Sequence, residues 1–126
     1  MSEAYLADSC AVIVFLADQP MSPRMRAIMQ EADVAVSAIT VWEITRKAAL
    51  GKLPASWGAD GLAVLLHRQG FRPLPLTWRD AERANRLPAL HRDPMDRMLI
   101  AQALHHDMPV ITSDRIFEDY GVSTIW

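Results

Sequence analysis

Acidic side chains are the residues of this sequence best suited to carry chemistry. In the stretch HRDPMDRMLIAQAL, Asp93 and Asp96 lie three residues apart where an apolar helical pattern begins. We expect Asp93 to be the N-cap residue with Pro94 at the first helical position, because both residue types are favoured there. Asp96 then falls in the first turn, where the helix dipole favours a carboxylate. It is also free to point out of the helix toward other acids and a metal ion.

Three further acids have local explanations of the same kind. Asp8 follows the buried run AYLA and could cap a helix that starts near Ser9. Glu43 lies three residues after Thr40, so TVWE has the pattern of a capping box. Asp114 follows the run VIT and could form a turn. Each explanation is adequate for one residue, but capping alone does not predict that acids gather at one edge of a fold.

The elements that must position these acids alternate along the chain. Buried or β-rich runs predict strands at 4–7, 34–37, 71–76, 108–112 and 122–126. Apolar periodicity, caps and C-terminal glycines predict helices at 9–18, 22–32, 40–50, 61–70, 77–87 and 94–104. This order predicts an α/β fold with a mostly parallel sheet covered on both faces. Functional sites of such sheets lie at the carboxyl ends of the strands, and the four acids are expected there: Asp8, Glu43, Asp96 and Asp114.

Length and composition favour one domain over residues 1–126. About half of the residues are apolar, and the formal charge of −2 gives no general attraction to nucleic acid. The single cysteine, Cys10, excludes an internal disulfide and is expected to be a buried core residue in a reducing compartment. The N-terminus has no basic leader pattern and the longest apolar run is too short to span a bilayer, so a cytoplasmic protein with no membrane partner is expected.

Closely grouped carboxylates repel one another unless a cation neutralises them, and Mg²⁺ or Mn²⁺ is the cation that suits oxygen ligands. Such an ion lowers the pKa of a bound water and stabilises the charge that develops on a phosphoryl group. The natural reaction is hydrolysis of a phosphodiester without a covalent protein intermediate. Nucleophilic catalysis is disfavoured, because Cys10 has no histidine at a recognisable partnering position and no serine lies in a nucleophile elbow.

Four stretches together resemble a known family. In order and spacing, YLADSCAVIVFL, VSAITVWEI, HRDPMDRMLIAQAL and VITSDRIFEDYGV are similar to the motifs of PIN-domain ribonucleases, and specifically of VapC-type toxins from toxin–antitoxin pairs. The resemblance implies a three-layer α/β/α fold with a five-stranded parallel sheet. It also implies a Mg²⁺- or Mn²⁺-dependent endoribonuclease, a homodimer, an RNA substrate, and a VapB-like antitoxin that blocks the site.

The resemblance assigns roles residue by residue. Four acids are implied to be catalytic and to bind the metal: Asp8, Glu43, Asp96 and Asp114. Three residues are implied to be auxiliary: Ser9, where threonine is commoner in the family, Asp93 and Ser113. Two arginines flank the acids and are expected either to bind RNA phosphates or to pair with the acidic cluster: Arg97 and Arg115.

Other classes of protein fit the pattern less well. A receiver-like module should have paired acids after its first strand and a lysine after its last core strand, whereas Asp8 precedes serine and no lysine follows Lys52. A phosphatase with an aspartyl nucleophile should show Asp-x-Asp where this chain has DSC. A catalytically inactive PIN-like binding module remains the alternative, although the intact set of four acids argues against it. The choice among tRNA, rRNA and mRNA is left open.

Overall fold

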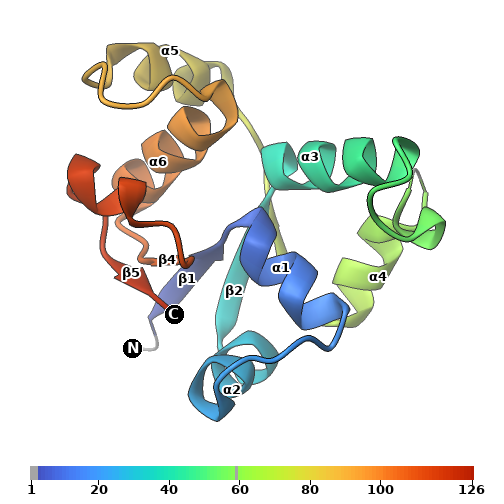
Figure 1. Cartoon of the computed structure of the whole chain (residues 1–126). Coiled ribbons are helices and arrows are strands. Elements are labelled where there is room, and N and C mark those ends of the chain that lie inside the picture. Colours follow the sequence, from blue (N-terminus) through green and yellow to red (C-terminus); the bar gives the residue numbers. More distant parts are fainter. Residues whose placement is uncertain (1–2, 59) are drawn as a thin grey trace.

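A five-stranded parallel sheet forms the centre of the computed structural model, which describes residues 3–58 and 60–126 (Figure 1). The strands lie in the order β3-β2-β1-β4-β5, and every pairing is parallel. Their bounds are β1 Ala4–Ala7, β2 Asp33–Ser37, β3 Arg72–Leu74, β4 Val110–Ile111 and β5 Thr124–Ile125. The predicted α/β class is therefore confirmed, and the proline-bearing strand β3 lies at an edge of the sheet as expected.

Helices cover both faces of this sheet, which gives three layers. The α-helices are α1 Ser9–Leu16, α2 Pro23–Glu31, α3 Ala38–Ala49, α4 Leu62–Arg68, α5 Trp78–Arg86 and α6 Pro94–His106, and the short 3₁₀ helices are η1 Ala55–Trp57 and η2 Arg115–Tyr120. Figure 1 shows α1 to α4 gathered on one side of the strands and α5 with α6 on the other. Among the described residues, no helix combines the length and the apolar character needed to cross a membrane.

Alternation along the strands divides the core into two parts. One part lies under α1 to α4 and takes these strand residues: Ala7, Val34, Val36 and Ile111. The other part lies under α6 and η2. It contains the strand residues next in sequence to those of the first part: Leu6, Ala35 and Val110. Successive side chains of a strand point to opposite faces, so a strand buried on both faces reads as a continuous apolar run.

Most helix starts follow the local sequence. The Ser22 hydroxyl accepts a hydrogen bond from the Met25 backbone N–H at 3.2 Å, and Pro23 opens α2. Gly70 follows α4 with a φ of +87°, a conformation that glycine adopts without strain. These elements form where predicted because their caps are contacts between residues only a few positions apart.

Two local expectations were wrong. Helix α3 begins at Ala38, capped by the Ser37 hydroxyl, which accepts from the Ile39 N–H at 3.2 Å, so Thr40 and Glu43 form no capping box. Ser37 ends β2 and caps α3 at once, which starts the helix earlier and moves Glu43 to its second turn. Cys10 is exposed rather than buried, because α1 turns Ala11 and Val12 toward the core instead.

A buried polar contact joins α5 to α6. Thr77 and Asp80 form a reciprocal capping box at the start of α5. Gln102 of α6 donates from Nε2 to Asp80 Oδ2 at 3.1 Å and to the Pro75 carbonyl at 3.0 Å. Burial acts to raise the pKa of Asp80, but the hydrogen bonds from Thr77 and Gln102 outweigh it and lower that pKa. The contact fixes α6, which carries Asp93 and Asp96.

Candidate active site

Asp8 is buried at the carboxyl edge of the sheet, with 7% of its surface exposed. It directly follows β1, and its backbone N–H donates to the Ile111 carbonyl at 3.2 Å. Its Oδ1 caps α1 by accepting from the Ala11 N–H at 2.9 Å, while its Oδ2 accepts from the Thr112 hydroxyl. The Asp8 side chain therefore caps α1 and also lies among the acids of the candidate site.

Burial raises the pKa of Asp8 to about 6. The hydrogen bonds from Thr112 and Ala11 act in the opposite direction, and the nearby negative charges of Asp96 and Glu43 add to the rise. Burial disfavours the charged form because the carboxylate loses water, and like charges increase that cost. The charges of Asp96 and Glu43 thus lie close enough to Asp8 to influence its ionisation.

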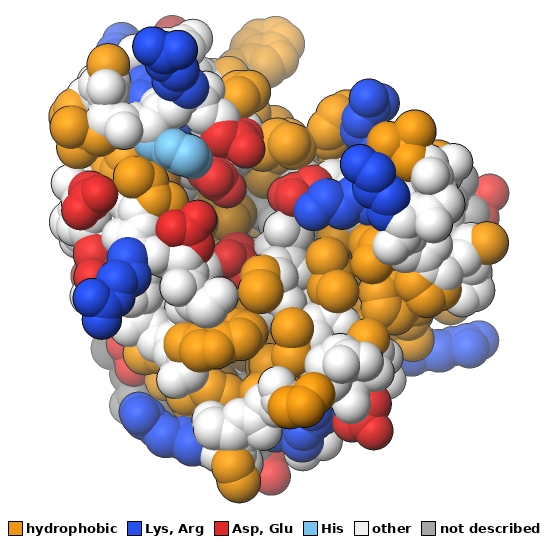
Figure 2. Space-filling view, in the orientation of Figure 1, with side chains coloured by type: hydrophobic (Ala, Val, Ile, Leu, Met, Phe, Trp, Pro, Cys, Tyr) orange, Lys and Arg blue, Asp and Glu red, His pale blue; other side chains and the backbone are white. Residues whose placement is uncertain are grey.

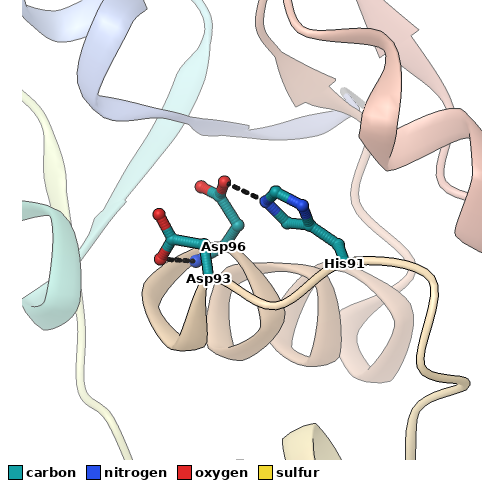
Figure 3. A group of neighbouring side chains, drawn as sticks. All are labelled: His91, Asp93 and Asp96. Carbon is teal, nitrogen blue, oxygen red and sulfur yellow. Dashed lines mark hydrogen bonds and ion pairs between the residues drawn. The ribbon is translucent and has the colours of Figure 1, made fainter.

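Asp93 and Asp96 divide two tasks at the start of α6. Asp93 is the N-cap, as predicted, and its Oδ1 accepts from the Met95 N–H at 2.9 Å and the Asp96 N–H at 3.4 Å. The Asp96 carboxylate does not complete a capping box but turns to His91, with 2.8 Å between Oδ2 and Nε2 (Figure 3). The side chains of His91, Asp93 and Asp96 each place a ligand atom within 4.8 Å of the other two.

The pKa of Asp96 is raised, chiefly by burial. The hydrogen bond from His91 lowers it, whereas the charges of Asp93 and Asp114 raise it. The charge of Asp114 acts on Asp96 from a separate segment of the chain, so the two acids lie near each other.

Asp114 and Glu43 lie at the margins of this acidic group. Asp114 caps η2 by accepting from the Ile116 N–H at 3.0 Å, and its own N–H donates to Thr112 Oγ1 at 3.0 Å. Glu43 projects from α3 and pairs with Lys47, with 3.2 Å between Nζ and Oε2. Figure 2 shows acidic side chains gathered around a hollow in the face between α6 and α3.

The four predicted acids thus share one edge without forming one tight cluster. Within residues 3–58 and 60–126, the group whose ligand atoms lie close enough to hold an ion together is His91, Asp93 and Asp96. Asp8, Glu43 and Asp114 each use a carboxylate oxygen in another contact, and mutual repulsion opposes closer approach. A donor set of carboxylates with one imidazole fits a divalent cation, because such a cation would neutralise the charges that raise the pKa of Asp8 and Asp96.

Comparison with known proteins identifies the family. The model of the family described as PIN domain matches residues 5–122. The chain belongs to the PIN domain family. No curated protein matches the sequence.

Solved structures share the fold of this PIN domain. VapBC2 of Rickettsia felis, bound to a DNA fragment from its promoter, is similar with a TM-score of 0.76 at 13% identity, covering 98% of each chain. DNA-bound VapBC of Salmonella typhimurium is similar at 0.74 and 19% identity, covering 99% of this chain and 98% of that one. A toxin–antitoxin complex from Klebsiella pneumoniae is similar at 0.68 and 16% identity, covering 97% and 96%. At these identities the likeness shows the fold.

The other residues predicted for the site have different surroundings. Ser9 is half-buried in the first turn of α1, and among the described residues its hydroxyl forms no hydrogen bond. Ser113 is exposed, and its Oγ lies 3.8 Å from Cys10 Sγ. Arg115 is exposed beside Asp114, where its guanidinium can meet a ligand.

Arg97, for which RNA phosphate or the acidic cluster was the expected partner, has a structural role in this PIN domain. Its guanidinium donates five hydrogen bonds of 2.7 to 3.3 Å to these acceptors: the carbonyls of Ala84, Leu87, Pro88 and His91 and the hydroxyl of Tyr120. It does not pair with the acidic cluster. The five bonds come from its two terminal nitrogens, Nη1 and Nη2, and hold the segment between α5 and α6 against the start of α6.

Sequence reasoning missed two residues that hold the acids. The Thr112 hydroxyl accepts from the Asp114 backbone and donates to Asp8, so it joins two strand ends. His91 positions Asp96 from the loop before α6. The signal for Thr112 was its place at the end of a strand, next to Ser113, and the signal for His91 was its presence in the same short stretch as both aspartates.

Proposed function

We propose that this PIN domain is a Mg²⁺- or Mn²⁺-dependent endoribonuclease. The observation that carries the proposal is the gathering of acids from distant segments at one edge of the sheet: the ligand atoms of His91, Asp93 and Asp96 lie within 4.8 Å of one another, and the buried carboxylate of Asp8 follows β1 at the same edge. Holding carboxylates together in partly dehydrated surroundings is unfavourable unless a cation joins them. A cation site of this kind at the carboxyl edge of a parallel sheet suits phosphodiester hydrolysis.

The residues of the site would then divide the work. Asp96, Asp93 and Asp8 would hold the metal, with Glu43 and Asp114 binding its water ligands. The bound ion would supply a water of lowered pKa and neutralise charge on the phosphoryl group. Among the residues that support these ligands, Thr112 orients Asp8 through its hydroxyl and His91 orients Asp96 through Nε2. Arg115 is left to bind an RNA phosphate.

We further propose that the chain is the VapC-type toxin of a toxin–antitoxin pair. Several neighbours in fold are VapBC or toxin–antitoxin complexes. The chain also exposes large apolar side chains on α3 and in the turn that follows it, Trp42 and Leu50, and on α4, Val64. Beside them lies an apolar groove of about 220 Å³ between α3, α4 and β3. A VapB-like antitoxin would cover this surface and place an arginine or lysine against the acids.

Two accompanying proposals are a cytoplasmic location and a homodimer. The location is proposed because the single thiol, Cys10, is exposed and unpaired, as is usual in a reducing compartment. Light scattering coupled to size-exclusion chromatography would give the mass of the assembly directly.

Cleavage of total RNA by the purified protein tests the central proposal. We expect cleavage with Mg²⁺ or Mn²⁺, none with excess EDTA, and none for Asp8→Asn or Asp114→Asn. Asp33→Asn is the matched control, because Asp33 is an exposed acid at the start of β2, the opposite end of the sheet, where it pairs with Arg72. Cleavage that survives EDTA overturns the metal mechanism. Binding of RNA without any cleavage would instead indicate an inactive binding module.

The antitoxin proposal has its own test. Stoichiometric addition of a VapB-like antitoxin that binds this chain should abolish cleavage. A complex that forms while cleavage continues undiminished would show that the antitoxin does not block the site.

A further inference from the structure

The end of β5 brings an aromatic side chain to the acidic edge of the sheet. Ala7 of β1 is in register with Ile111 of β4, and Ile111 is in register with Ile125 of β5. The next residues along the three strands are therefore Asp8, Thr112 and Trp126. The Thr112 N–H donates to the Ile125 carbonyl at 3.0 Å, which keeps this row aligned. Adjacent strands lie about 4.8 Å apart, so Trp126 lies two strand spacings from Asp8 across the sheet, about 10 Å.

A hollow of about 270 Å³ opens between Trp126 and the acid Asp114. Its wall comes from the turn after β4, from η2 and from the end of β5. Trp126 is 47% exposed, so about half of this large apolar side chain is open to solvent beside a polar site. The fold does not need this indole in its core, so its exposed face is available to a ligand.

The charges around the hollow are arranged asymmetrically. Arg115, next to Asp114, supplies a guanidinium that suits a phosphate. Glu118 supplies a carboxylate that is fixed by the Thr124 hydroxyl, which donates to its Oε1 at 2.8 Å. An anionic backbone would therefore lie on the Arg115 side, whereas Glu118 can accept hydrogen bonds from the N–H groups of a base.

We propose that this hollow is a nucleotide subsite for single-stranded RNA, in which a base stacks on the Trp126 indole while Arg115 binds the adjoining phosphate. The inference rests on the proposed endoribonuclease function and extends it. Aromatic side chains stack on unpaired bases, whereas the bases of a duplex are already stacked on one another. The subsite lies beside Asp114, so it would hold a nucleotide next to the scissile phosphate. It therefore predicts that unpaired RNA is the preferred substrate.

The test measures binding and turnover separately. Binding of a short fluorescein-labelled single-stranded RNA is followed by fluorescence anisotropy with Mg²⁺, in an Asp8→Asn background that preserves the RNA. We expect Trp126→Ala to weaken binding roughly 5- to 100-fold, the range typical of one stacked base. Trp126→Phe should restore most of the affinity, because phenylalanine keeps an aromatic face. Arg115→Ala should weaken binding and reduce its dependence on salt.

Trp78→Ala is the matched control, because Trp78 is 93% exposed on α5 and does not line the hollow. In the otherwise unmutated enzyme, Trp126→Ala should raise KM more than it lowers kcat, and melting curves check that the fold is intact. Unchanged affinity in Trp126→Ala, or equal loss in Trp78→Ala, overturns the subsite. If the parent protein never cleaves RNA but the binding pattern holds, the subsite is supported and the nuclease proposal fails.

Discussion

Neutralising Asp8 should make the metal-free protein more stable at neutral pH, even though Asp8 is proposed to be catalytic. Asp8→Asn keeps an acceptor oxygen for the Ala11 N–H, so the cap of α1 survives. What the substitution removes is a buried negative charge near Asp96 and Glu43. The free energy of unfolding in EDTA should therefore be higher for the variant than for the wild type above pH 6.

The magnitude follows from the pKa of Asp8, which rises from 3.8 to about 6. The native state binds this proton more tightly than the unfolded chain, so the proton stabilises the wild type. This stabilisation by the proton is fully present below about pH 3.8 and is lost as the pH rises through 6. At about 1.4 kcal/mol per pKa unit, the full change is roughly 3 kcal/mol. About 2 kcal/mol of this stabilisation is lost between pH 4.5 and pH 7.5.

Urea unfolding of both proteins, followed by circular dichroism at several pH values in EDTA, measures this difference. The stability of the wild type relative to Asp8→Asn should fall steadily from pH 4.5 to pH 7.5. Added Mg²⁺ or Mn²⁺ should then stabilise the wild type more than the variant, because a ligand stabilises the state that binds it. A difference between the two proteins that stays constant with pH would refute the reasoning, since it would mean that Asp8 titrates as an ordinary surface carboxyl.

Four other substitutions separate structural roles from catalytic ones. Asp93→Ala should lower the free energy of unfolding by about 0.5 to 2 kcal/mol in EDTA, because it removes the cap of α6, and by more with Mg²⁺, because it also removes a proposed ligand. Asp96→Asn should be neutral or stabilising in EDTA and should gain less melting temperature from Mg²⁺; a destabilised variant with the full metal response would make Asp96 only a helix-start residue. Arg97→Ala should destabilise by about 2 kcal/mol or more in urea titrations, because five acceptors lose a charged donor; a loss of RNA affinity with unchanged stability would contradict this. Thr112→Val should raise the pKa of Asp8 further by removing its donor, which would move the acid limb of the pH–rate profile to higher pH; an unmoved limb would argue against this role.

The sequence by itself determined the features that depend on near neighbours. Asp93 caps α6 and Ser22 caps α2 because a short polar side chain reaches backbone N–H groups two or three residues ahead. Apolar runs in the predicted strands indicated a sheet buried on both faces. Because functional sites of parallel sheets lie at the carboxyl ends of the strands, Asp8 and Asp114 were expected at one edge. Even here Ser37 displaced Thr40 as the cap of α3, because two suitable caps competed within one short stretch.

Only the tertiary structure decided which distant side chains meet at that edge. Thr112 donates to Asp8 across 104 positions of sequence, and Trp126 joins the same row because the register of β4 and β5 places it there. Arg97 was expected either to bind RNA phosphate or to pair with the acids, because the sequence does not reveal the carbonyls that surround it. Local contacts follow from the geometry of a single helix or strand. The contacts of Thr112, Trp126 and Arg97 depend instead on the order of the strands in the sheet and on the packing of α6. A pattern along the chain specifies neither.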